Sequence, residues 1–164
     1  QIRGDLSDER TLDLAMRFGT PITIDSRVRD GSLRGAATDA GATCLLFEGG
    51  EAYRFNEDAV QMGVDGILRV LHRLGMTDEL VPPAPAPRIA NSSRWVRASK
   101  SGIVDCRLPL GADVEKGEQM GVLRDPFGKQ LGRLRAPTDG VLVGKLLHPL
   151  VNQGDAVLHV AATS

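Results

Sequence analysis

The spacing of apolar residues along the chain changes at a proline-rich segment, and the two sides of that segment predict different structures. Before it, Asp8–Phe18 has apolar residues on one helical face, and Ser32–Ala40 predicts a second, shorter helix. An extended Pro21–Ile24 lies between them. The run Thr43–Phe47 is apolar enough to be buried on both faces, as in a parallel or mixed sheet. Helices and strands therefore alternate, as in an α/β domain.

The longest predicted helix runs from an N-cap at Asn56 to Gly75. Its apolar residues recur at intervals of three and four, which places them on one face. These residues are Val60, Val64, Ile67, Leu68, Leu71 and Leu74. We expect this stripe to face the core, and we expect His72 beside it to be a surface or packing residue rather than a ligand.

The segment Val81–Arg88 contains four prolines, which prevent a helix and favour an extended, semi-rigid spacer. Beyond it the chain consists of short β-like stretches punctuated by glycine, which is typical of an all-β domain. The predicted organisation is an α/β part over residues 1–80, a linker over 81–91 and a β-sandwich over 92–164.

The β part contains an internal repeat. Gly102–Val104 followed by Gly111–Gly117 is echoed by Gly140–Leu142 followed by Pro149–Gly154. Neither half can bury its apolar face alone, so two such halves related by a pseudo-twofold axis would close a small sandwich.

Composition narrows the function classes. With 164 residues, 41% hydrophobic and 25% charged, the sequence is typical of a soluble globular protein of one ordinary or two small domains. A net charge of -1 provides no basic field for nucleic acid. Since no apolar run approaches the roughly 18–20 residues of a membrane helix and no signal-peptide pattern is present, we expect a cytoplasmic protein without a membrane partner.

The cysteines Cys44 and Cys106 lie in separate apolar segments without a CxxC spacing. We therefore expect two buried free thiols rather than a disulfide or a cysteine zinc site.

The repeat, with Arg135–Leu142 and Val151–Val157, resembles the barrel-sandwich hybrid fold of biotinyl and lipoyl carrier domains. A carrier presents a modifiable lysine on the hairpin between the halves, and Lys129 falls near that place. Its neighbours match neither Met-Lys-Met nor an acidic-Lys-small tripeptide, so we interpret Lys129 as a solvent-exposed turn residue.

The β module, joined through a proline-containing linker to an α/β segment, resembles the C-terminal half of bacterial proteins of the succinylglutamate desuccinylase/aspartoacylase family. The resemblance covers nearly the whole chain. It is carried, in order, by Gly31–Ala37, Gly41–Gly50, the long helix, Gly121–Gly128 and Ala136–Gly140. It implies a zinc-carboxypeptidase-like α/β part followed by a barrel-sandwich hybrid-like domain. It also implies a zinc-dependent deacylase that cleaves an N-acyl amino acid or a similar small carboxylate-bearing amide.

The same resemblance implies that Glu48 is the catalytic residue, as the general base toward a zinc-bound water. The residues themselves suit this role, since Glu48 ends an apolar strand and is followed by Gly49 and Gly50, which leave room for a substrate. From spacing alone, the alternative is a glutamate that ends a strand and meets solvent. Glu51 is a nearby competitor, beyond the glycines.

Arg34 is the substrate-binding candidate, because a guanidinium can bind a substrate carboxylate through two parallel hydrogen bonds. The alternative is a solvated arginine at a helix start. Tyr53 could supply a hydroxyl, but we assign it no role.

A zinc site of this class uses a His-x-x-Glu pair and a second, distant histidine. None of His72, His148 and His159 has that context, so no metal ligand is assigned in this chain. The resemblance implies zinc in the intact parent, with ligands upstream of Gln1. The isolated chain is therefore predicted to be inactive and to partner the rest of its own catalytic domain, with a homo-oligomer left open. The alternative function is a non-catalytic β-sandwich module for binding or assembly.

Overall fold

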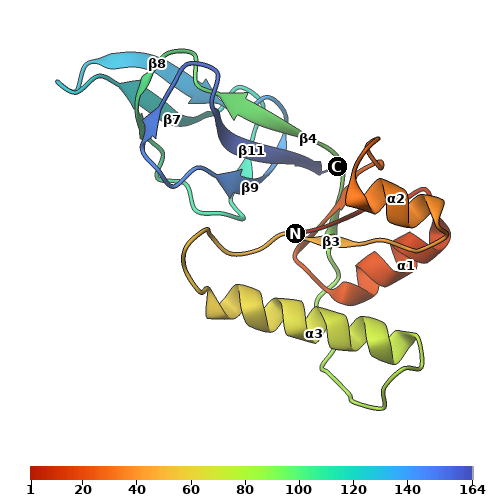
Figure 1. The fold of residues 1–164 in the computed structure, drawn as a ribbon. Helices are drawn as coiled ribbons and strands as arrows, with labels where there is room; N and C mark the ends of the chain where they lie inside the picture. Colours follow the sequence, from red (N-terminus) through yellow and green to blue (C-terminus); the bar gives the residue numbers. More distant parts are fainter. Residues whose placement is uncertain (164) are drawn as a thin grey trace. The chain divides into compact units, whose positions relative to one another are not determined.

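The computed structural model describes residues 1–163. It divides into two compact units, Gln1–Ile89 and Ala90–Ser164. The first unit is mixed α/β and contains all the helices among the described residues, while the second consists of strands and turns (Figure 1).

The first unit is built on a short mixed sheet in which β1 lies between β3 and β2. The chain order is β1 (Ile2–Gly4), α1 (Glu9–Phe18), β2 (Ile22–Asp25), α2 (Leu33–Asp39), β3 (Leu46–Phe47) and α3 (Glu57–Arg73). β1 runs parallel to β2 and antiparallel to β3. The central strand β1 is the element that the sequence did not predict, because three residues are too few for a period to show.

The three helices begin where the sequence predicts. A side-chain oxygen at each N-cap accepts the N–H of the third residue along, which satisfies one of the free donors of the first turn. The pairs are Asp8 with Thr11, Ser32 with Gly35, and Asn56 with Ala59. The Thr11 hydroxyl and N–H together hold the pKa of Asp8 below its usual value. At the other end, α1 stops at Gly19, whose φ of 83° lies in the left-handed region that favours glycine.

The strand β3 differs from its prediction. It has two residues instead of five, it lies at the edge of the sheet of the first unit, and Leu46 is 43% exposed. The prediction that this run is buried on both faces is wrong, because β1 covers only one of its edges and α3 covers only the face that carries Phe47.

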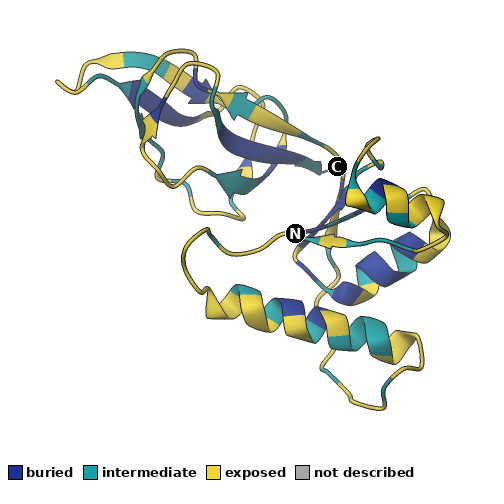
Figure 2. Cartoon of the chain, in the orientation of Figure 1, coloured by how far each residue is buried: buried dark blue, intermediate teal, exposed yellow. Residues whose placement is uncertain are grey.

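The helix α3 also differs from its prediction. Its buried residues are Gly63 and Gly66, whereas Val60, Val64 and Ile67 of the apolar stripe are about half exposed (Figure 2). A Cβ on Gly66 would lie 2.2 Å from the Phe18 ring, so α3 approaches its neighbours through the glycines. The stripe expected to face the core is therefore largely turned to solvent.

The start of the proline-rich segment is tied to the first unit rather than free of it. Arg69 of α3 donates from Nε to the carbonyl of Pro82 (2.9 Å) and from Nη1 to the carbonyl of Phe18 (3.0 Å). Farther on, the N–H of Arg88 donates to the carbonyl of Pro21 at 3.0 Å. These contacts order a stretch that can form no helix.

The second unit has two layers of antiparallel strands. Its strands are β4 (Arg88–Arg97), β5 (Gly102–Asp105), β6 (Asp113–Val114), β7 (Gln119–Arg124), β8 (Gln130–Arg135), β9 (Gly140–Lys145), β10 (Leu150–Val151) and β11 (Ala156–Thr163). One layer has the order β4-β11-β9-β6 and the other β10-β5-β7-β8. Leu123, Leu134, Leu142 and Leu158 are almost fully buried in the core of this unit.

The predicted repeat is present, and its halves exchange strands. β5 of the first half pairs with β10 of the second, and β9 of the second half pairs with β6 of the first. The registers are equivalent, since Val151 faces Gly102 and Val114 faces Gly140. Each half thus supplies the short strand that completes a layer of the other.

Among the described residues, the structure contains no helix with the length and apolar character needed to cross a membrane.

Candidate functional site

Glu48 is held through both its backbone and its carboxylate by Gln1 and by Arg3 of β1. Its N–H donates to the carbonyl of Gln1 at 3.0 Å. Its Oε2 accepts hydrogen bonds from Nε of Arg3 (2.7 Å) and Nε2 of Gln1 (2.8 Å). The Arg3 side chain is 15% exposed and that of Glu48 is 45% exposed. The carboxylate is therefore oriented by a largely buried cation and still open to solvent.

The partner residue Arg3 was not identified from the sequence. It lies in β1 between the buried residues Ile2 and Gly4, and the Ile2 side chain lies on the opposite face of the strand, as alternation requires. An arginine between two residues of a three-residue strand has no periodic signal. Its role becomes visible only when β1 is paired with β3.

The glycines after Glu48 have a packing role in addition to the room predicted for a substrate. A Cβ on Gly49 would lie 2.8 Å from the Phe47 ring, so the chain passes directly over that ring. Gly50 has a φ of 79°, which turns the chain away from the strand toward α3. Both positions favour glycine for structural reasons.

Arg34 lies on α2 and binds a different part of the unit. Its Nη2 donates to the carbonyl of Arg27 (2.9 Å) and to Oγ of Ser26 (3.2 Å), directly after β2. Its Nη1 is buried and has no hydrogen-bond partner among the described residues.

The two predicted site residues are attached at opposite ends of the central strand. Ser26 bonds to the carbonyl of Gly4 at 2.8 Å, whereas Glu48 pairs with Gln1. Three residues of β-strand separate these points by roughly 10 Å. In this chain, Arg34 and Glu48 therefore bind separate partners.

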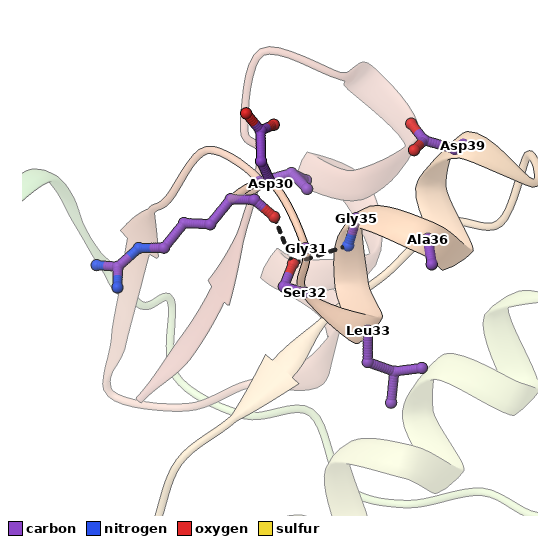
Figure 3. A pocket seen from close by; sticks show the side chains of 9 residues that line it. Asp30, Gly31, Ser32, Leu33, Gly35, Ala36 and Asp39 are labelled. Atoms are coloured by element: carbon purple, nitrogen blue, oxygen red, sulfur yellow. Dashed lines mark hydrogen bonds between the residues drawn. The ribbon is translucent and has the colours of Figure 1, made fainter.

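A pocket adjoins α2, but its polar groups serve the helix cap. Oγ of Ser32 donates to the carbonyl of Arg29 (2.7 Å) and accepts the N–H of Gly35 (3.0 Å), as Figure 3 shows. The lining residues are Val28, Arg29, Asp30, Gly31, Ser32, Leu33, Gly35, Ala36 and Asp39. The guanidinium of Arg34 is directed instead toward Ser26 and Arg27.

The remaining candidates near Glu48 lie in the loop before α3. Glu51 forms an ion pair with Arg54, with 3.4 Å between Oε1 and Nε. Tyr53 is fully exposed and has a φ of 63°, which is uncommon for a residue with a side chain. Neither side chain makes a described contact with Glu48.

The histidines occupy three unrelated places. His72 on α3 and His148 after β9 are exposed, and each has Nδ1 near a backbone carbonyl. His159 on β11 is buried and stacks on Trp95, with ring centroids 4.3 Å apart. Within residues 1–163, no group of three or more His, Cys, Asp or Glu side chains could hold a metal ion, so these residues do not fit a zinc site.

Both cysteines are free, but Cys44 and Cys106 are only partly buried, so the prediction of buried thiols is wrong in degree. The run that carries Cys44 is a sheet edge, and Cys106 begins a loop at the margin of the second unit's core.

Lys129 closes the β7–β8 hairpin without occupying its tip. Its N–H donates to Oδ1 of Asp125 at 2.9 Å, and the N–H of Phe127 donates to the same oxygen. Phe127 at the tip is 95% exposed, and Lys129 is exposed as well, as predicted for a turn residue. This geometry gives Lys129 the structural role of a turn residue.

Comparisons with solved structures match the chain over almost its full length. A succinylglutamate desuccinylase/aspartoacylase from Rhodobacter sphaeroides is 26% identical, with a TM-score of 0.85, covering 99% of this chain and 53% of that chain. The ectoine utilization protein EutE (DoeB) from Ruegeria pomeroyi is 17% identical, with a TM-score of 0.88, covering 99% and 55%. An aspartoacylase family protein from Mesorhizobium loti is 20% identical, with a TM-score of 0.74, covering 99% and 52%.

No protein-family model matches the sequence, and a search of curated proteins finds no match. The chain spans about half the length of the solved structures that it matches.

The matched fold is mixed α/β, and it corresponds to about half of the fold of those solved structures. The chain corresponds to the C-terminal portion of proteins of the succinylglutamate desuccinylase/aspartoacylase family. The resemblance predicted from the sequence is therefore confirmed.

Proposed function

We propose that this chain is the C-terminal portion of a zinc-dependent deacylase, with Glu48 as its general base and Arg34 as a substrate-binding residue. The observation that carries the proposal is the match to the Rhodobacter sphaeroides protein over 99% of the chain at 26% identity. The substrate class is an N-acyl amino acid or a similar small amide that bears a carboxylate.

The proposed reaction is hydrolysis of an amide. The Glu48 carboxylate accepts a proton from water while the water oxygen forms a bond to the amide carbon. The carbon–nitrogen bond then breaks, and the proton passes to the leaving nitrogen. The products are a carboxylic acid and an amine. Arg3 keeps Glu48 in one orientation, because its Nε lies 2.7 Å from Oε2.

The unpartnered Nη1 of Arg34 supports its proposed role, since a buried N–H without a partner is a donor that a substrate carboxylate would satisfy. The zinc would polarise the water and the amide carbonyl. Because the described residues do not fit a zinc site, its ligands belong to polypeptide outside this chain.

Replacing Glu48 by Gln in the intact enzyme, meaning this chain together with a metal-binding half, tests the proposal. The change keeps the shape of the side chain and removes the base, so we expect kcat to fall by about 100-fold or more. KM and bound zinc should remain close to those of the unchanged enzyme.

The matched control is Glu51→Gln, which removes a carboxylate from the neighbouring loop and should leave kcat within about twofold. Full turnover by the Glu48 variant would sink the assignment. A non-catalytic binding or assembly module, the alternative function, predicts that neither variant affects a chemical step.

A further inference from the structure

The apolar stripe of α3 is a surface without a partner in the described chain. Val60, Val64 and Ile67 are 49%, 46% and 54% exposed, and Leu74 at the end of the helix is 41% exposed. Branched aliphatic side chains are thus exposed on three successive turns and again at the end of the helix. A contiguous apolar surface of this kind in a protein marks a binding surface.

The stripe is separate from the surface that α3 already uses. The helix contacts Phe47 and Phe18 through Gly63 and Gly66. Val64 and Ile67 each follow one of these glycines by one residue, which places them about 100° farther around the helix axis. The apolar arc of α3 is therefore wider than the part that the first unit covers.

The outer edge of β3 is a second feature without a partner among the described strands. β3 is an edge strand of the sheet. One side of its backbone pairs with β1, and its other side pairs with no described strand. The helix lies over β3, because a Cβ on Gly63 would contact the Phe47 ring at 3.1 Å. The exposed stripe and the open strand edge thus belong to two elements that pack on each other, and Glu48 directly follows β3.

The lengths of the matched solved structures indicate which polypeptide would cover the stripe and the strand edge. They match this chain over 99% of its length, yet the chain spans only 53–55% of theirs. A half-fold of comparable size can supply both a strand for β3 and apolar side chains for α3.

A second copy of the chain fits this surface poorly. The stripe of a 17-residue helix is about 25 Å long and about 10 Å wide, or about 250 Å², whereas a stable dimer of separate chains buries about 800 Å² on each partner. A half-fold in the same polypeptide docks intramolecularly, so this minimum area does not apply to it. Two copies of β3, with two residues each, would add few hydrogen bonds.

We propose that the exposed stripe of α3 and the open edge of β3 are the docking surface for the polypeptide that completes the α/β unit. This inference rests on the proposed function, because it names the partner that would bring the zinc ligands. The partner binds through apolar contact along α3 and adds a strand beside β3, next to Glu48.

Thiol labelling tests the proposal in a chimera. The half of the Rhodobacter sphaeroides protein that this chain does not match is joined ahead of Gln1, and Val64→Cys and Ile67→Cys are introduced one at a time. Labelling is followed position by position through peptide masses. We expect both cysteines to react about tenfold more slowly in the chimera than in the chain alone, because the partner covers them.

The matched control is Asp58→Cys, an exposed position on the polar side of α3, whose rate should be the same in the chimera and in the chain alone. Equal rates for Val64→Cys in both proteins would overturn the proposal, whether or not the chimera is compact. Labelling in the chain alone that slows as its concentration rises would show a second copy as the occupant and would also overturn it. Because labelling measures no turnover, its failure is distinct from a failure of the Glu48→Gln test.

Discussion

Glu48 has two properties that a general base needs. Its carboxylate is fixed by hydrogen bonds from Arg3 and Gln1, yet nearly half of the side chain remains exposed. The fixed orientation comes from β1, since Arg3 is largely buried and can hold few other positions. A substrate would therefore meet a carboxylate that is already oriented.

The Arg3–Glu48 pair should contribute measurably to stability. We expect a double-mutant cycle with Arg3→Met and Glu48→Gln to give a coupling free energy of about 0.5–1 kcal/mol, because one partner is exposed and solvent screens the pair. Urea unfolding followed by circular dichroism at the helical band reports on the first unit, since the described helices all lie there. Added salt should reduce the coupling.

The Asp13–Arg73 pair is the matched reference, since its charged atoms are 3.0 Å apart and both side chains are substantially exposed. Its coupling should be smaller than that of Arg3 and Glu48. A coupling between Arg3 and Glu48 that is no larger than the reference would contradict the view that Arg3 fixes the carboxylate.

At the scale of elements, α3 shows what an apolar pattern does and does not determine. The N-cap Asn56 and the spacing of apolar residues predicted the helix and its start. The same spacing predicted that the apolar stripe faces the core. In the structure, α3 instead packs against Phe47 and Phe18 through Gly63 and Gly66. Glycine contributes nothing to an apolar pattern, so a contact formed by close backbone approach leaves no periodic signal.

The close approach at the two glycines predicts effects of different size for two similar substitutions. Gly66→Ala should destabilise the first unit by about 1–2 kcal/mol, because the new Cβ would lie 2.2 Å from the Phe18 ring and the clash outweighs the better helix propensity. Gly63→Ala, whose Cβ would be 3.1 Å from Phe47, should change the free energy of unfolding by less than about 1 kcal/mol.

Urea unfolding at the helical band measures both variants. Equal effects of Gly63→Ala and Gly66→Ala would show that the close approach of α3 to Phe18 is not what fixes the helix.

A residue of the candidate site could be predicted only where the pattern that identifies it lies within one short segment of the sequence. Glu48 follows an apolar run and precedes two glycines, a pattern visible in the sequence. Its partner Arg3 lies 45 residues away in a strand of three residues, so no local pattern connects them. Arg34 was identified by its residue type and helix start, but its bonds to Ser26 and Arg27 depend on a turn after β2.

At the scale of the whole molecule, the second unit depends on exchange between its two halves. A cut at the tip of the β7–β8 hairpin would leave four strand pairs joining the two pieces: β7–β8, β5–β10, β6–β9 and β4–β11. Only β5–β7 and β9–β11 would be internal to a piece. Each piece alone would therefore expose the apolar face that the other covers.

Cutting the chain between Phe127 and Gly128 should leave the second unit folded. Phe127 is 95% exposed at the hairpin tip, so a short protease site inserted there is accessible and disturbs no strand. After cleavage in buffer, we expect the two pieces to elute together in size-exclusion chromatography and to keep the fluorescence of Trp95, because the exchanged strands hold them. In about 6 M guanidinium chloride they should separate. The uncut insertion variant is the control, and separation of the pieces in buffer would mean that the exchanged strands are too weak to hold the halves together without the hairpin.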